Sequence, residues 1–522
     1  MTFQRVISPF GLLFVGISSV IGSGWLFGSL YAAQIAGPAA LLSWVIGGIL
    51  MIIIALTFAE LGSAFPVAGG MIQFAQYSQG PLVGFLMGWM IWVSSVAVAP
   101  VETLGLVQYT ANYLPGLMKK VEGTTVLTTL GIGVSAIIML IMCILNYYGA
   151  LFFSRSNSLI TAIKLIVPLL TIVLLLGKHF SIHPFHATAS GGFLPFGWHG
   201  VFAALPLGGV IYSFIGSNTV LQLAAETKNP QRSIPFALIG SMIFCTVLYA
   251  LLQMAFVGAS SPDSFAAGWN KLHFVGDTGP FSGIMTMLGL GWFVMIVYAD
   301  ALISPFGTGY VFTASTARIG YGLSEIGFFP AALKKLNTRG VPARSIALNY
   351  CVGIVLFLPF PGWQKLVSFI ISCFIVSYII GPIALVGLRK THPTQHRPFR
   401  LPYANTIALL ALYICNLLIF WTGWQTVYRM MITLCIGLIC FALYCYREKN
   451  NLWLSQWRTS WWVIPYFISL TVISYLGTFG GGINKIPFGV DFAVIAILTV
   501  IIFFFASGRR SGSRDLQVLI ID

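Results

Sequence analysis

The stretch VIGSGWLFGS, residues 20–29, lies near the middle of the first apolar segment and decides the fold of this chain. Gly22, Ser23, Gly24 and Gly28 fall inside a run that is long enough to cross a membrane. Glycine within a helix costs about 1 kcal/mol relative to alanine, and backbone groups freed inside a bilayer must be satisfied by protein or water. The stretch therefore predicts a helix that opens at mid-membrane and lines a cavity. Close helix packing through small residues is the alternative.

A second copy of this pattern favours the first interpretation. FIGSN, residues 214–218, repeats VIGSG, residues 20–24, in the sixth apolar segment. The copies lie in spans one and six, an odd offset of five spans, so the second is inverted relative to the first in the membrane. Paired interrupted helices in two inverted halves are typical of a transporter with its substrate site at the bilayer midplane.

The composition identifies a polytopic membrane protein. Of 522 residues, 58% are hydrophobic and 7% are charged, and the mean hydropathy is +0.91. The net charge of +15 comes from 27 basic and 12 acidic residues, and it is better explained by cytoplasmic loops than by a nucleic-acid surface. The eight cysteines lie in apolar runs without a CxxC pair, so we expect neither disulfides nor a metal site nor a cofactor.

Membrane-spanning segments can be placed along the whole chain. With about 20 residues needed per span, the apolar runs number fourteen: 8–36, 41–64, 82–114, 125–150, 156–177, 199–225, 233–259, 281–316, 345–361, 364–388, 403–424, 430–446, 461–477 and 488–507. If the N-terminus is cytoplasmic, the basic residues left outside are only Lys119, Lys120, Lys178, Lys271, Lys365, Arg429 and Lys485. This bias predicts a multi-pass protein of the plasma (inner) membrane with both termini in the cytoplasm.

Two loops are richer in sequence features than simple connections need to be. ELGSAFPVAGGMIQFAQYSQGP, residues 60–81, is either a loop tucked back into the inner vestibule or a turn. In ETKNPQRSIP, residues 226–235, the pair Asn229-Pro230 ends one helix, and Ser233 with Pro235 starts the next. Glu60 and Glu226 are expected at membrane edges, where they organise cytoplasmic turns and gates.

These motifs together resemble a known family. GSG in span one, ELGxxFPxxGG after span two, GPxxGFxxGW opening span three and ExKNPQRxIP after span six are similar to amino-acid permeases of the amino acid–polyamine–organocation superfamily. The resemblance covers residues 8–446. GSGWLF, residues 22–27, combined with LGLGWFVMIVYADALISPFGTG, residues 288–309, looks most like the bacterial aspartate–proton symporter group. Most members of the superfamily have a small aliphatic residue after GSG. Trp25 at this position is what narrows the resemblance to the aspartate–proton symporter group.

The resemblance implies an all-α bundle built as a five-plus-five inverted repeat around broken helices one and six. Residues 1–388 would form the transport core, with repeats at 8–177 and 199–388. Four additional helices would occupy 389–507, followed by a cytoplasmic tail at 508–522.

An amino acid needs partners for its carboxylate and its ammonium group. The start of a half-helix offers free N–H groups and a positive dipole end to the carboxylate, and the opened carbonyls accept from the ammonium. By resemblance, Ser23 and Gly24 bind the carboxylate, while Val20, Tyr212 and Ile215 provide carbonyls. The substrate-binding residues predicted in full are Val20, Gly22, Ser23, Gly24, Glu102, Tyr212, Ile215 and Gly216.

Lys164 is the strongest single-residue signal. It lies nine residues after Arg155, which places it roughly 13 Å into an apolar layer about 30 Å thick. A lysine at such depth is costly, and low dielectric disfavours its charged form, so it is a candidate for carrying a proton. The alternative is a structural ion pair with a neighbouring helix. By resemblance, a lysine in this fifth helix implies coupling to protons instead of sodium.

Two acids also lie within spans. Glu102 is in span three, at a position that the resemblance places among substrate-lining residues. Asp300 is in span eight and shares a helical face with Ser304 and Thr308. Glu102 and Asp300 are therefore candidates for proton coupling together with Lys164, and the alternative for either acid is to pair with that lysine.

The leading functional hypothesis is a proton-coupled importer of acidic amino acids, aspartate or glutamate, working in the lipid bilayer. The alternative is a transporter or exchanger of cationic amino acids or polyamines, for which the two acids would be counter-charges. An intramembrane enzyme would need a nucleophile–base pair or a metal motif such as HExxH, and the sequence contains neither. A channel is a third option, and paired inverted breaks favour a carrier over it.

Overall fold

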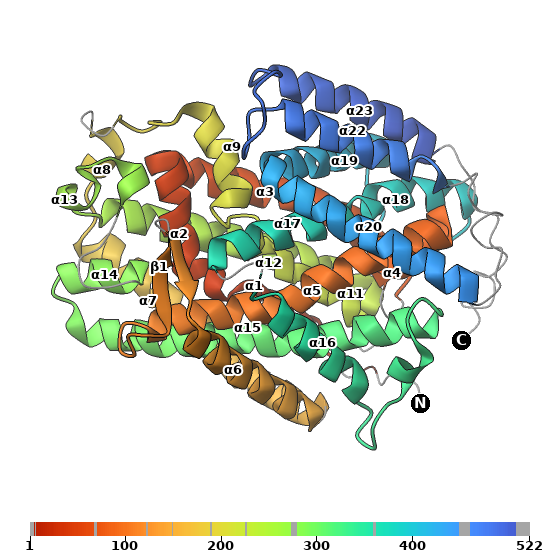
Figure 1. Cartoon of the computed structure of the whole chain (residues 1–522), viewed down its shortest axis with the longest axis horizontal. Helices are drawn as coiled ribbons and strands as arrows, with labels where there is room; N and C mark the ends of the chain where they lie inside the picture. The colour runs from red at the N-terminus through yellow and green to blue at the C-terminus, as the bar shows by residue number, and fades with distance from the viewer. Residues whose placement is uncertain are drawn as a thin grey trace.

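The computed structural model describes residue 5 and residues 7–66, 70–121, 124–148, 150–187, 191–224, 227–272, 279–358, 362–447 and 460–507. Helices dominate this part of the chain (Figure 1), and ten helical runs are long and apolar enough to cross a membrane, or eleven if one bent pair counts as a span. The chain is thus an all-α polytopic membrane protein, which confirms the predicted fold class.

The elements lie in the following order along the chain. The N-terminal half contains α1 (Pro9–Val20), α2 (Ser23–Ala36), η1 (Gly37–Ala39), α3 (Ala40–Ala64), α4 (Gly70–Gln79), α5 (Pro81–Thr110), β1 (Met118–Val121), β2 (Thr124–Leu127), α6 (Thr129–Tyr147), α7 (Ala150–Lys178), α8 (His183–His186), α9 (Gly197–Leu207), α10 (Tyr212–Ile215), η3 (Gly216–Asn218), α11 (Thr219–Gln222) and α12 (Pro230–Gly258). The remainder contains α13 (Pro262–Phe265), η5 (Trp269–Lys271), α14 (Pro280–Met287), α15 (Gly291–Glu325), η6 (Ala331–Lys334), α16 (Ala343–Val355), α17 (Trp363–Tyr378), α18 (Ile380–Thr391), α19 (Ala404–Trp421), α20 (Trp424–Arg447), α22 (Val463–Leu476) and α23 (Val490–Ser507).

Each of the fourteen predicted spans overlaps at least one of these helices. The 42-residue run from Ser23 to Ala64 would be about 63 Å long if straight, twice the thickness of an apolar layer. It turns at Gly37, whose φ is +65°, so it comprises α2 from the first predicted span and α3, the second. The helix α4 and the β1–β2 hairpin were not predicted as elements.

Helix one is broken where the sequence predicts. α1 ends at Val20 and α2 begins at Ser23. Between them Ile21 is extended, with φ −83° and ψ 99°, and Gly22 lies outside the helical region at φ −139° and ψ −142°. Gly22, the residue before α2, has no side chain, so the side chain that accepts a hydrogen bond from the new helix start comes from a residue elsewhere in the chain.

Helix six breaks earlier than predicted. α9 ends at Leu207, and the part beginning at Tyr212 is bent from it by 50°. Gly209 lies in this break at φ +78°, a conformation that favours glycine. The predicted opening at Ile215–Ser217 is wrong, because the chain there stays helical and tightens into η3. Gly216 serves close backbone contact instead, since a Cβ there would lie 2.0 Å from the Ser19 carbonyl oxygen.

The core lies between α5, α15, α3 and α12. α5 packs along α15, and α3 packs along α12. Peripheral helices turn apolar side chains outward, as Ile137, Ile141 and Ile144 of α6 do at helical spacing. An apolar outer face is expected where the surrounding solvent is lipid.

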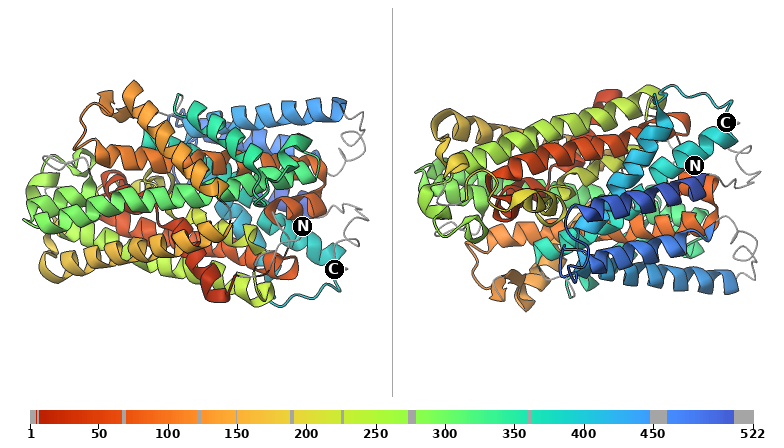
Figure 2. Two further views of the ribbon diagram at one scale, coloured as in Figure 1. Left: turned by 90° about the horizontal axis from the view of Figure 1, so that it is seen from below. Right: turned by 90° about the horizontal axis from the view of Figure 1, so that it is seen from above.

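The connections gather at two ends of the long axis. The hairpin, α8 and α13 lie at one end (Figures 1 and 2), in the loops predicted to be outside, and α14, which begins the predicted span 281–316, lies at the same end (Figure 1). α4 and the end of α18 lie toward the other (Figure 1), where the basic inner loops were predicted. At that end the buried Glu60 carboxylate accepts from Arg389, with Nε–Oε1 2.8 Å and Nη2–Oε2 2.6 Å, and from the Leu401 N–H at 2.7 Å. The location of the loops therefore follows the predicted alternation of spans.

The helices after residue 388 form one side of the molecule (Figure 1, blue). α19 packs against both α3 and α18, and α23 packs against α19. Buried Asn416 links these helices by donating to Thr499 Oγ1 at 2.8 Å and accepting from the Tyr466 hydroxyl. The division into two repeats and four additional helices stays a prediction, and the predicted tail, Glu226 and residues 67–69 lie outside the described residues.

Candidate functional site

The first turn of α2 receives a carboxylate from α5. The Ser23 N–H, freed by the break, donates to Glu102 Oε2 at 2.7 Å. The Tyr212 hydroxyl, at the start of α10, donates to Glu102 Oε1 at 2.6 Å. The Glu102 side chain is 1% exposed, so these two donors replace water for its carboxylate. The break in helix one, the break in helix six and α5 thus meet at one carboxyl group.

Gly22 makes this approach sterically feasible. A Cβ at that position would lie 2.7 Å from Glu102 Oε1 and 2.8 Å from Thr308 Oγ1. Gly22 therefore lets the side chains of Glu102 and Thr308 come close to the backbone, and it also lies where α1 has ended. Gly24, one residue into α2, likewise leaves room for Ser213, because a Cβ there would lie 2.3 Å from the serine oxygen.

Lys164 lies on the other side of the same break. Its fully buried amine donates to the Ser18 carbonyl at 2.7 Å and to Thr308 Oγ1 at 2.6 Å. Thr308 in turn donates to the Ile21 carbonyl at 2.9 Å. We expected contacts with carbonyls near Val20 to Gly22 or with the Ser304–Thr308 face of α15. The lysine contacts that face at Thr308 and reaches helix one two residues earlier than expected.

Asp300 occupies a neighbouring position on α15. Its Oδ1 accepts from Ser304 at 2.8 Å, and its Oδ2 accepts from the Trp25 indole at 3.1 Å. Asp300, Ser304 and Thr308 are all buried, so the predicted shared face turns inward. Lys164 interacts electrostatically with both Asp300 and Glu102. The three predicted ionisable groups therefore belong to one buried set.

Two of the carbonyls assigned to a substrate ammonium already accept hydrogen bonds from tyrosines. The Tyr249 hydroxyl of α12 donates to the Val20 carbonyl, and the Tyr378 hydroxyl of α17 donates to the Ile215 carbonyl, both at 3.1 Å. Neither tyrosine was predicted from sequence. Tyrosines are frequent in this chain, and no spacing rule connects either of them to a carbonyl far along the sequence.

Trp363 is a further residue that the sequence analysis missed. At the start of α17, its indole donates to Ser23 Oγ at 2.8 Å, and its ring meets that of Tyr212 edge-on at 5.9 Å. It also stacks on Tyr31 at 5.5 Å. The only signal was a tryptophan directly after Gly362 at a span start, which is common at membrane interfaces. Trp363 closes the site between the two breaks on the α17 side.

The comparison with known proteins covers nearly the whole chain. Residues 7–443 match the protein family described as amino acid permease. A glutamate/serine transporter of Bacillus subtilis is 39% identical over 518 residues, covering 98% of this chain and 94% of the relative. An aspartate-proton symporter of the same organism is 34% identical over 508 residues, 97% and 96% of the two chains. A branched-chain amino acid permease, also from Bacillus subtilis, is 26% identical over 460 residues, 86% and 95% of the two chains.

Proposed function

This chain belongs to the amino acid permease family, and we propose that it imports acidic amino acids, aspartate and glutamate, together with protons. The names of two relatives, a glutamate/serine transporter and an aspartate-proton symporter, support this choice of substrate and coupling ion. We further propose that it is a multi-pass protein of the inner membrane with both termini in the cytoplasm and no enzymatic activity. The basic residues Arg389 and Arg397, at the end of the molecule near Glu60, support that orientation.

One observation carries the proposal: the Glu102 carboxylate lies on the free N–H of Ser23. A helix start favours an anion through its unpaired N–H groups and its dipole. The α-carboxylate of an amino acid has the same shape and charge as the group found there. Substrate carboxylate and Glu102 would therefore compete for the start of α2.

Competition of this kind couples substrate binding to a proton. Ionised Glu102 accepts strongly from Ser23 and Tyr212, and it would repel a second carboxylate in a low-dielectric site. Protonated Glu102 loses that charge and leaves the helix start to the substrate. Proton binding and substrate binding then strengthen one another by the same factor, as thermodynamic linkage requires.

Lys164 and Asp300 complete the charge balance. Charged Lys164 offsets one of the two acids, and its short bonds to Ser18 and Thr308 hold the end of α1. Loss of its proton would weaken these charge-assisted bonds and release the break in helix one. Asp300, held by Trp25 and Ser304, is a further group that can carry a proton. We assign proton coupling to Glu102, Lys164 and Asp300.

The same charges favour a second candidate. Two buried acids face one buried lysine, so a substrate that brings positive charge would neutralise the set without added protons. A cationic amino acid or polyamine transporter is therefore the alternative function.

Reconstituted vesicles distinguish the two. Purified protein in proteoliposomes with an imposed inward proton gradient should accumulate labelled aspartate or glutamate, and excess lysine or a polyamine should not compete. Dissipating the gradient with a protonophore should abolish accumulation. Uptake of lysine that excess aspartate leaves unchanged would replace the proposal by the alternative, and accumulation that survives the protonophore would remove proton coupling.

A further inference from the structure

A small cavity lies beside the inner part of broken helix six. It has a volume of about 20 Å³, room for a water molecule, and it lies between α3, α4, η3, α11, α12 and α17. Its lining is Met51, Ile54, Ala55, Phe58, Met71, Ser217, Asn218, Leu221, Leu238, Met242 and Tyr378. Phe58 is two residues before Glu60, so the cavity lies between the central site and the end of the molecule with the Glu60–Arg389 pair.

Asn218 is the unusual member of this lining. It is 3% exposed, and both its amide oxygen and its amide nitrogen lack a hydrogen-bond partner. One turn later, Gln222 of α11 also has an unpaired amide nitrogen, while its oxygen accepts from Ser315. Residues four apart share a helical face, so two buried amides with unused donors follow one another along the inner part of helix six.

An unpaired buried amide destabilises the fold that contains it, because its hydrogen bonds to water are lost without replacement. A leucine of similar size would suit the surrounding methionines and aromatic rings better. One water molecule in this cavity can satisfy only part of the donor and acceptor capacity of the amide, so its full set of partners belongs to another state of the protein, in which a larger polar group occupies the cavity. The adjoining residues Met51, Met71 and Met242 are unbranched and adaptable, which suits a wall that repacks as a passage opens.

We propose that Asn218 and Gln222 form a second, transient substrate site on the inner side of the break, which receives the amino acid as it leaves the central site. This inference rests on the proposed transport function. A primary amide donates to carboxylates and accepts from ammonium groups, so it can partner both ends of an amino acid. Because it is neutral, it neither repels an acidic substrate nor holds it as firmly as a lysine would, which suits a release path.

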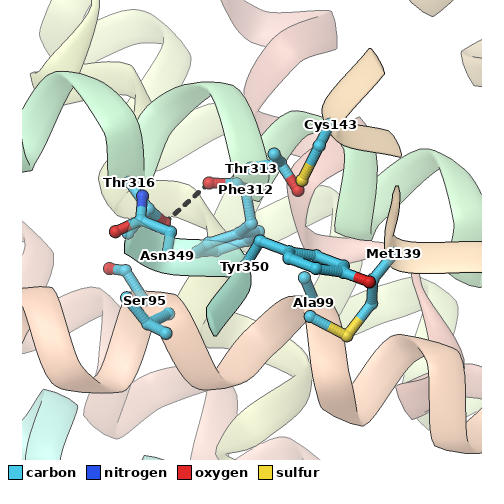
Figure 3. A pocket seen from close by; sticks show the side chains of 10 residues that line it. Ser95, Ala99, Met139, Cys143, Phe312, Thr313, Thr316, Asn349 and Tyr350 are labelled. Carbon is cyan, nitrogen blue, oxygen red and sulfur yellow. Dashed lines mark hydrogen bonds between the residues drawn. The ribbon is translucent and has the colours of Figure 1, made fainter. Parts of the chain in front are cut away.

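The test compares Asn218 with an amide in the other small cavity. Asn349 of α16 lines a cavity of about 10 Å³ with Ser95 and Thr316 (Figure 3), between α5, α6, α15 and α16. Its amide oxygen is paired with the Trp92 indole at 3.0 Å. This cavity is lined by no residue of helices one or six. Asn349→Leu therefore matches the chemical change of Asn218→Leu away from the proposed path.

The Asn218→Leu variant should lose transport rate while it keeps most of its affinity for substrate. Asn218→Leu should lower the maximal uptake rate of aspartate about fivefold, the factor expected for one lost hydrogen bond, while equilibrium binding in detergent changes less than about twofold. Asn349→Leu should change neither by more than about twofold. Asn218→Ser keeps a hydrogen-bond donor in a smaller side chain, so its uptake rate should lie between those of Asn218→Leu and the wild type. It replaces Asn218→Leu in the comparison if the leucine variant does not fold.

A variant that adds a negative charge at position 218 gives a second test. A purely structural role of Asn218 would not make the loss of uptake depend on the charge of the substrate. Asn218→Asp should slow uptake of aspartate more than uptake of serine, because the added carboxylate repels the acidic side chain. Equal uptake rates in wild type and Asn218→Leu, or equal losses for aspartate and serine in Asn218→Asp, would overturn the inference. If wild-type vesicles take up neither aspartate nor glutamate, the proposed function fails, and the comparison of Asn218→Leu with Asn349→Leu is made with the amino acid that they do take up.

Discussion

Helices one and six carry similar five-residue stretches, VIGSG and FIGSN, and the structure uses the two stretches differently. In helix one the chain opens at Ile21 and Gly22, and charged groups fill the opening. In helix six the corresponding letters stay helical, the opening lies at Gly209, and Asn218 lines a cavity with its amide unpaired. A shared motif thus marks where two helices approach, and the neighbouring groups decide which of them opens.

The largest expected effect tests the charged side of this comparison. Lys164→Ala removes the donor that holds the Ser18 carbonyl and leaves the buried acids without their counter-charge. Breaking a buried charge set costs about 3–5 kcal/mol, so uphill uptake should fall at least about 100-fold. Substrate binding should weaken less, because Ser23 and Tyr212 remain.

Accumulation in vesicles and equilibrium binding measure the two quantities for Lys164→Ala. The control is Lys178→Ala, in the last turn of the same helix and exposed, which should retain wild-type uptake. Uphill uptake by Lys164→Ala that still follows an imposed pH gradient would refute the coupling role.

The second effect concerns Glu102 and pH. In the proposed mechanism a proton binds Glu102 before substrate takes its place, so wild-type affinity for aspartate should rise as pH falls, by up to about tenfold per pH unit for one linked proton. Glu102→Gln imitates the protonated form, so it should bind aspartate or glutamate with little dependence on pH near neutrality.

Titration of binding between pH 5.5 and 8 checks this expectation. Exposed Glu325→Gln, on α15, is the matched control and should keep the wild-type slope. Loss of acidic amino-acid binding in Glu102→Gln, combined with a wild type that prefers lysine or arginine, would support the cationic alternative.

The third effect separates the two breaks by their glycines. Gly22→Ala would bring a Cβ within 2.7 Å of Glu102, so it should displace that carboxylate and change aspartate affinity and its pH dependence, by about tenfold. Gly209→Ala strains a residue at φ +78° and crowds Trp363 at 2.8 Å, so it should mainly lower thermal stability.

Binding titrations and thermal melting of the two variants show whether the effects divide in this way. An unchanged pH dependence in Gly22→Ala would mean that the contact between Ser23 and Glu102 does not control substrate binding.

The smallest effect concerns the tyrosines that occupy the two carbonyls. Tyr249→Phe frees the Val20 carbonyl and Tyr378→Phe frees that of Ile215, each at the loss of one hydrogen bond. Affinity for aspartate should change by no more than about fivefold. Tyr249→Phe should have the larger effect, because Val20 borders the open break and Ile215 lies within helical turns. Equal effects in a binding assay would argue against this distinction.

Sequence reasoning predicted those features that depend on local chemistry. Long apolar runs give the membrane-spanning helices, of which the described residues hold ten or eleven by length and composition, and Gly22 marks the break in helix one, because neither needs knowledge of a partner. The depth of Lys164 in its span also follows from counting residues along a helix. The sequence-based prediction of an opening at Ile215–Ser217 was wrong, because Gly216 allows close contact with Ser19 and does not open the helix.

What the sequence alone determined is therefore the membrane class, the positions of the spans and the presence of buried charges. What only the tertiary structure decided is which groups meet: Glu102 on Ser23, Lys164 on Ser18, Trp363 on Ser23, and Asn218 without a partner. Glu102 and Ser23 are 79 residues apart in the chain, and Trp363 and Ser23 are 340 apart. Hydropathy and periodicity report how each segment meets its solvent, whereas the pairing of polar groups across such separations is determined by the packing of whole helices.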